Sequence, residues 1–159
     1  MKTTLATTGL KNNVQVTNAL AQLLAELQVH YTNLRNLHWN IKGHGFFVLH
    51  EEYEKMYEDV ASKVDEVAER LLQLGVTPEH RFSAYLQQAQ LSELDVVTCG
   101  HKGLAYVLDA LAVLIAQERQ ILTAASENGD EVTVAMMSDY LREQEKSVWM
   151  LTAYATQPE

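Results

Sequence analysis

Hydrophobic residues recur every three or four positions along four long stretches of the chain, which is the spacing of one face of an α-helix. The stretches cover about residues 13–39, 47–74, 95–126 and 131–155. Glycines at 43 and 45 interrupt the first pair, Gly75 and Pro78 follow the second stretch, and Asn128-Gly129-Asp130 separates the last pair. The pattern predicts two helical hairpins.

The connection between the two hairpins is unusually long. It spans residues 76–94, and residues 83–90 within it have the composition of a short helix. The order of elements predicts an all-α, ferritin-like four-helix bundle with a short extra helix in the long crossover. Residues 1–12 are polar and lack periodicity, so we expect a flexible tail there and a single domain over residues 13–159.

Composition narrows the class of protein further. The chain has 159 residues, 47% of them hydrophobic, which is enough to bury one core. It contains no apolar run of membrane-spanning length and no apolar signal segment at its start, so we expect a cytoplasmic protein that does not enter a membrane. A single cysteine excludes an internal disulfide framework and agrees with a reducing compartment.

Two pairs of metal-ligating side chains lie on the second predicted helix. His50 and Glu54 are spaced i, i+4, as are Asp65 and Glu69, so each pair shares one face of the helix. The pairs are eleven residues apart, which at 1.5 Å per residue is roughly 16 Å and far beyond a coordination shell. His38, at the end of the preceding helix, is a fifth candidate ligand.

Two interpretations follow from this spacing. Each pair alone is equally typical of a solvated helix face, and the pairs are then unrelated. Alternatively, a second copy running antiparallel brings its Asp65 and Glu69 to His38, His50 and Glu54 of the first copy. We adopt the second interpretation because His38 completes a set of histidine and carboxylate ligands that suits ferrous iron. The chain has no Glu-x-x-His motif, so a di-iron site within one bundle is not expected.

Two segments resemble signatures of a known family. The run His38-Trp39-Asn40-Ile41-Lys42-Gly43, followed by Leu49-His50 and Glu54, is similar to the first signature of Dps proteins. These are the mini-ferritins, also described as DNA-binding proteins from starved cells. Residues 64–70, Val-Asp-Glu-Val-Ala-Glu-Arg, are similar to the second Dps signature. The resemblance spans essentially the whole chain.

The resemblance implies an iron-oxidising and iron-storing shell. Its members form a hollow dodecamer with ferroxidase sites shared across a two-fold interface and prefer hydrogen peroxide as the oxidant. It assigns His38, His50 and Glu54 to one subunit and Asp65 and Glu69 to its partner. The family often has aspartate where this chain has Glu54, so the role of that side chain is less well defined. The alternative function is a mainly non-enzymatic shell that binds DNA or sequesters metal or haem.

Three further sets of residues could contribute chemistry. Trp39, beside His38, could intercept a stray radical or simply plug the helix end. Cys99 opens the third predicted helix, where a thiol can bind a soft metal or haem iron, although a small buried apolar side chain is the simpler interpretation. The resemblance also suggests an acidic iron-entry pore near the last turn, although acids there are equally typical of helix capping. The candidate pore residues are Glu127, Asp130, Glu131 and Asp139.

The charge of the chain argues against nucleic acid as the main partner. Lys2 and Lys11 are the only basic residues in the first thirteen, and the formal net charge is −9. A twelve-copy shell would then carry a formal charge of about −108, which attracts cations and repels DNA. Twelve weakly basic arms could still bind DNA through avidity, so weak and non-specific DNA binding is kept as a secondary expectation.

Overall fold

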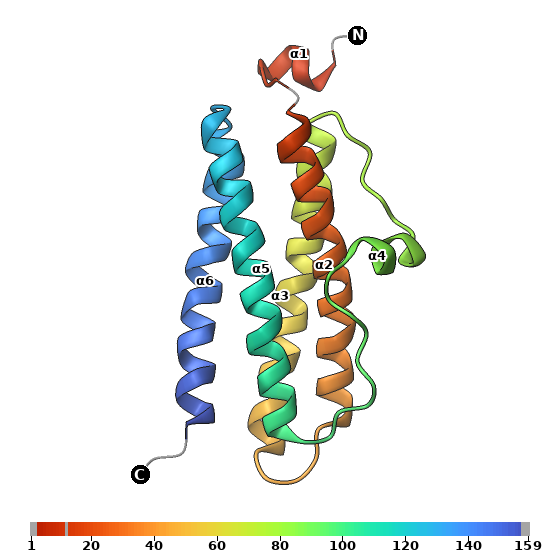
Figure 1. Cartoon of the computed structure of the whole chain (residues 1–159), viewed down its shortest axis with the longest axis vertical. Coiled ribbons are helices and arrows are strands. Elements are labelled where there is room, and N and C mark those ends of the chain that lie inside the picture. The colour runs from red at the N-terminus through yellow and green to blue at the C-terminus, as the bar shows by residue number, and fades with distance from the viewer. Residues whose placement is uncertain (1–2, 12, 157–159) are drawn as a thin grey trace.

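The structure is a computed structural model that describes residues 3–11 and 13–156, and it confirms an all-helical bundle (Figure 1). Lys2, one of the two lysines of the expected basic arm, lies outside the described residues, as do residues 157–159. The helices are α1 (Thr4–Thr8), α2 (Val14–Asn40), α3 (Phe46–Gln73), α4 (Phe82–Gln88), α5 (Gly100–Glu127) and α6 (Glu131–Ala155).

The four long helices form two antiparallel hairpins, α2–α3 and α5–α6, that pack side by side (Figure 1). The crossover carries α4, the predicted short helix, against α2. The buried carboxylate of Glu26 fixes the crossover because it accepts hydrogen bonds from the backbone N–H groups of Gln90 and Leu91, at 2.7 and 2.9 Å. This is the ferritin-like topology with one long connection.

The core is formed by the predicted apolar stripes. Fully buried leucines from α2 pack against α3 and α5, and the buried set includes Leu20, Leu23, Leu24, Leu27, Leu34, Leu37, Val67, Leu71, Val107, Leu114, Ile121 and Met137. Residues that the pattern placed on the same stripes, such as Val64 and Val148, are partly buried and pack against this cluster.

Helix boundaries agree with the sequence pattern except at α5. That helix was expected from about Asp95 but begins at Gly100. Val96, Val97 and Thr98 are β-branched and favour extended backbone, and the Thr98 carbonyl accepts a bond from the Lys42 N–H at 3.1 Å. Through this hydrogen bond, the segment connects the end of the crossover to the α2–α3 turn.

The N-terminal segment contains the short helix α1, which the sequence pattern did not predict. The Thr3 hydroxyl caps its start by accepting from the Ala6 N–H, and Gly9 ends it in a left-handed conformation with φ 74°. Five residues are too few for a helix that is stable by itself, and none of them is buried. The flexibility of the tail stays a prediction. Among the described helices, none has the length and apolar character needed to cross a membrane.

Candidate metal centre

His38 and His50 form a stacked pair at the end of the bundle where α2 ends and α3 begins. Their ring centroids lie 3.9 Å apart with an interplanar angle of 15°. The turn between the helices is tight because Gly43 and Gly45 adopt positive φ values of 80° and 85°, which glycine reaches without steric cost. The hairpin thus brings together two histidines separated by twelve residues.

Reciprocal hydrogen bonds fix both rings. Nδ1 of His38 lies 2.8 Å from the carbonyl oxygen of His50, and Nδ1 of His50 lies 2.8 Å from the carbonyl oxygen of His38. A carbonyl can only accept, so each Nδ1 carries the proton and donates it. In the neutral imidazole, the Nε2 lone pair of each ring is then available to a metal ion. A ligating histidine is commonly oriented in this way, through its other ring nitrogen.

Two aromatic residues that the sequence reasoning missed pack around this pair. Phe46 stacks on His50, with centroids 5.0 Å apart, and the Tyr57 ring meets His38 edge to face at 5.4 Å. The Tyr57 hydroxyl donates to Oε1 of Glu54 at 3.4 Å. Burial, and then the nearby Glu54 carboxylate, raise the pKa of Tyr57. The sequence could have indicated Tyr57 through its spacing, because it follows Glu54 by three residues and so shares the same face of the helix.

Asp65 and Glu69 lie on α3, well away from the histidine pair. Both are exposed, and helical rise separates Asp65 from Glu54 by about 16 Å within the chain. Across residues 3–11 and 13–156, no three histidine, cysteine, aspartate or glutamate side chains gather closely enough to hold a metal ion. One subunit therefore brings together His38 and His50; Glu54 lies one helical turn after His50 on α3, and Asp65 and Glu69 lie further along the same helix.

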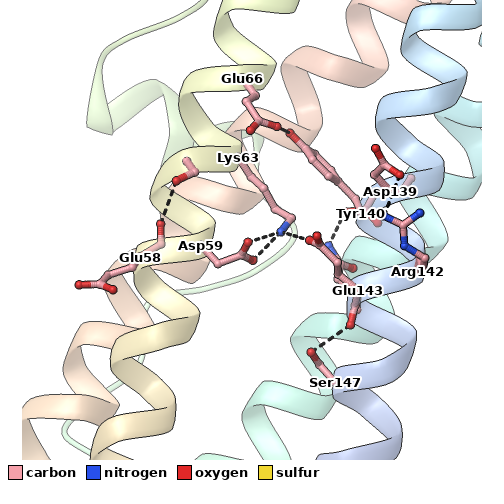
Figure 2. A network of polar contacts seen from close by, with 12 residues as sticks. Glu58, Asp59, Lys63, Glu66, Asp139, Tyr140, Arg142, Glu143 and Ser147 are labelled. Carbon is pink, nitrogen blue, oxygen red and sulfur yellow. Dashed lines mark hydrogen bonds and ion pairs between the residues drawn. The ribbon is translucent and has the colours of Figure 1, made fainter.

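A buried lysine lies between α3 and α6, in the bundle interior (Figure 2). Lys63 is 3% exposed, and its Nζ donates to the carboxylates of Asp59 and of Glu143, the latter at 2.9 Å. Burial alone lowers the pKa of Lys63, but hydrogen bonds to Asp59 and Glu143 outweigh it and raise the pKa. A fixed ammonium group here opposes a metal cation, which agrees with the missing Glu-x-x-His motifs.

A second buried group lies next to this network. Glu118 on α5 is fully buried, and its Oε1 accepts from Nε2 of Gln144 at 2.6 Å, while no described residue pairs with its Oε2. Burial raises the pKa of Glu118 to about 8. A carboxyl group with this pKa is mostly protonated at neutral pH, so it adds little negative charge to the interior.

The remaining candidate residues are placed as follows. Trp39 is 62% exposed, which does not fit a plug at the helix end, and the Arg35 guanidinium lies 4.5 Å from its ring centroid. Asp130 is the N-cap of α6; it accepts from the Thr133 N–H at 3.0 Å and pairs with Arg70 at 2.6 Å, as the capping interpretation predicts. The other candidate pore residues, Glu127, Glu131 and Asp139, are exposed.

Cys99 is the N-cap of α5, and its thiol is exposed rather than buried as the simpler interpretation expected. It lines a pocket of about 510 Å³ with His44, His101 and Lys42. The described residues do not gather into a metal-binding cluster here either, so nothing in the geometry supports a soft-metal or haem site.

Comparison with known proteins agrees with this architecture. A family model described as a ferritin-like domain matches residues 17–159. The DNA protection during starvation protein of Porphyromonas gingivalis is 55% identical over 158 residues, covering 98% of this chain and 99% of the relative. The crystal structure of a Dps protein from Vibrio cholerae, described as a member of a broad superfamily of ferritin-like diiron-carboxylate proteins, superposes with a TM-score of 0.87 at 48% identity, covering 89% of each chain. Dps from Staphylococcus aureus gives a TM-score of 0.88 at 29% identity, covering 93% of this chain and all of that one.

The four-helix topology and the family match define a ferritin-like protein. With the paired histidines and the high identity to a relative over nearly its full length, the chain belongs to the Dps family, as the two sequence signatures predicted. Similarity to a protein described as a member of the diiron-carboxylate superfamily makes iron the metal expected of this family.

Proposed function

We propose that this protein oxidises ferrous iron with hydrogen peroxide at sites shared by two subunits and stores the ferric product in a hollow dodecamer. In each site, His38, His50 and Glu54 come from one subunit and Asp65 and Glu69 from its partner. The observation that carries the proposal is the stacked histidine pair, whose reciprocal Nδ1 bonds leave two Nε2 atoms available as ligands.

The arrangement of residues along α3 supports a site completed by a second copy. At about 100° per residue, His50, Glu54, Asp65 and Glu69 fall within about 100° of one another around the helix. The same stripe presents the exposed side chain of Phe47 near one end, and that of Leu72 near the other. A second α3 running antiparallel along this stripe would cover these apolar side chains and bring each histidine end against the partner's acidic end.

The chemistry follows from this ligand set. Two ferrous ions are the substrate, and each gives one electron to hydrogen peroxide; with two protons taken up, the peroxide becomes two water molecules. Pairing the two electrons avoids release of a hydroxyl radical. Imidazole nitrogens hold the ferrous ions, while the carboxylates of Glu54, Asp65 and Glu69 favour the harder ferric product. Trp39 is exposed beside His38 and could trap a radical that escapes the site.

Ferrous loading under anaerobic conditions, followed by peroxide, tests the proposal. We expect a rise in ferric absorbance in the wild type and its loss in a His50→Ala/Asp65→Ala variant. The matched control is Glu51→Ala, which removes an exposed carboxylate of α3 that pairs with Lys55 and is outside the site. No rise in the wild type, or an unchanged rise in the double variant, would refute the proposal.

The acidic shell favours iron over DNA as the principal partner. We also propose that iron enters the shell near Glu127, Glu131 and Asp139. We further propose that the protein works in the cytoplasm. DNA binding is secondary, because the chain carries a formal charge of −9. A gel-shift assay at low salt that shows no retardation would remove the DNA contribution.

A further inference from the structure

Oxidisable side chains lie in a row beside the histidine pair. Tyr57 on α3 meets His38 edge to face, with ring centroids 5.4 Å apart and an interplanar angle of 81°. Tyr31 on α2 meets Tyr57 edge to face in turn, at 6.0 Å and 86°. The Arg35 guanidinium then lies 5.4 Å from the Tyr31 centroid and 4.5 Å from the centroid of Trp39, which is exposed. The contacts lead from a candidate iron ligand to the surface of the bundle.

Helical spacing and core packing hold this row in place. Tyr31, Arg35 and Trp39 follow one another at intervals of four residues on α2, so they share one face of the helix. Tyr31 and Tyr57 are half-buried and pack against the core, and centroids 6.0 Å apart are typical of aromatic rings in contact. The two phenol rings are therefore close enough to exchange an electron directly.

The phenol of Tyr57 lies against the candidate iron ligands. Its hydroxyl donates to Oε1 of Glu54 at 3.4 Å, and its ring contacts His38, so it touches two of the five residues proposed to bind iron. Packing against His38 requires only the ring. The O–H group, in contrast, supplies an electron and a proton that a phenylalanine at this position would lack.

A site that holds a single ferrous ion produces an oxidant that Tyr57 can reduce. One ferrous ion gives peroxide one electron, and the products are a ferric ion, hydroxide and a hydroxyl radical. One electron and one proton from the Tyr57 phenol convert that radical to water and leave a neutral phenoxyl radical. Tyr31 can pass an electron and a proton to Tyr57 in turn, so the two phenols share the radical.

Arg35 directs the radical to the tyrosines rather than to Trp39. Loss of an electron from an indole first gives a radical cation, and a guanidinium 4.5 Å from the ring centroid opposes that positive charge. A phenoxyl radical is neutral once its proton has left, so the same guanidinium does not oppose it. Trp39 is then reached only by radicals that escape the two phenols.

We propose that Tyr57 and Tyr31 form a radical sink for the iron site and consume the hydroxyl radical that a site with one ferrous ion makes from peroxide. This inference rests on the proposed function, because ferrous iron and peroxide supply the oxidant. It adds a second protective step to the paired transfer of electrons, and it gives the Tyr57 hydroxyl a chemical role.

Electron paramagnetic resonance tests the radical sink directly. The full-length assembled protein is loaded anaerobically with fewer ferrous ions than it has sites, mixed with excess peroxide and frozen at once. Ferric absorbance is recorded on the same mixture, and a spin trap in a parallel sample measures the hydroxyl radicals that escape. We expect a phenoxyl signal in the wild type that narrows when the protein is produced with ring-deuterated tyrosine, but not with deuterated tryptophan.

Conservative variants separate the chemistry from packing. Tyr57→Phe keeps the ring against His38, so it should fold normally, lose the phenoxyl signal per ferric ion formed and release more trapped radical. Tyr31→Phe should keep a phenoxyl signal with an altered hyperfine pattern, because the radical then stays on Tyr57. Tyr154→Phe is the matched control: it removes an exposed phenol of α6 outside the row and should change neither the signal nor the amount of trapped radical.

Several results would overturn the radical sink. A ferric rise without a phenoxyl signal in the wild type would do so and leave the proposed function intact. The same holds for a signal that deuterated tryptophan narrows in place of deuterated tyrosine, and for a signal that is unchanged in Tyr57→Phe. A signal unchanged in Tyr31→Phe would overturn the sharing between the two phenols. A wild type that forms no ferric ion would overturn both the proposed function and the radical sink.

Discussion

A subunit carrying His50→Ala and a subunit carrying Asp65→Ala should each form a shell without a complete iron site. Each substitution removes a ligand from every site that two identical copies build. Co-expressed in one cell, however, the two variants should recover part of the activity. The reason is geometric: Glu54 and Asp65 of one chain are about 16 Å apart along α3, so in the proposed site the two halves come from different copies.

The recovered fraction can be worked out from this arrangement. In a mixed pair, one site combines both substitutions and the other contains all five native ligands. If equal amounts of the two variants pair at random, about half of the pairs are mixed, and about a quarter of all sites are complete. Peroxide-driven ferric absorbance per subunit should therefore reach about a quarter of the wild-type rate, whereas a site within one subunit would give none.

Wild-type chain mixed with the His50→Ala/Asp65→Ala chain is the matched control. A mixed pair then has one defect in each of its sites, so only pairs of two wild-type chains are active. A shared site again predicts about a quarter of the wild-type rate, but a site within one subunit predicts about half. Activity in either single-variant shell close to that of the wild type, or no recovery in the mixture, would refute the shared site.

Three further substitutions test the interior. Asp130→Ala should lower the free energy of unfolding by about 3–5 kcal/mol, because Arg70 keeps a buried charge that its partner no longer balances. Glu118→Gln should stabilise the protein at pH 8 but not at pH 4.5. Burial raises the pKa of Glu118 to about 8, so the folded wild-type protein favours the protonated carboxyl. The stability that this protonated group contributes is complete below the unfolded pKa of about 4.5 and is lost as the pH rises. Gly103→Ala should destabilise by about 1–3 kcal/mol, because the new methyl group would meet the Tyr53 hydroxyl at 2.5 Å, and Tyr53→Phe in the same chain should recover most of the loss.

Urea unfolding followed by circular dichroism measures all three effects. For the first, Asp139→Ala is the control: this carboxylate pairs with Arg142 at the surface and should contribute less than about 1 kcal/mol. Equal losses in the two variants would contradict the role of the buried pair. For Glu118→Gln, the same difference from wild type at both pH values would exclude titration of that group. For Gly103→Ala, failure of Tyr53→Phe to restore stability would exclude the steric explanation.

Local patterns in the sequence were enough to place the long helices and to separate the two pairs of candidate ligands on α3. The boundaries of α2, α3 and α6 could be read from the spacing of leucines and from the glycine and asparagine breaks, because these signals act between neighbouring residues. Simple helical rise also showed that His50 and Asp65 cannot share a metal ion within one chain. The five candidate ligands could be proposed for the same reason, since the proposal depends only on residue type and spacing.

The orientation of the two histidine rings and the groups around them depend on how the helices pack. The reciprocal bonds between His38 and His50 require two antiparallel backbones at one register, which no local pattern encodes. Lys63 is buried between α3 and α6, where carboxylates from both helices accept hydrogen bonds from its Nζ (Figure 2). The start of α5 was missed because residues 95–99 are not helical and contact other elements instead: the Asp95 carbonyl accepts from Asn36, and the Thr98 carbonyl accepts from the Lys42 N–H. Each of these features depends on groups far apart in the chain, so it exists only after the hairpins have packed.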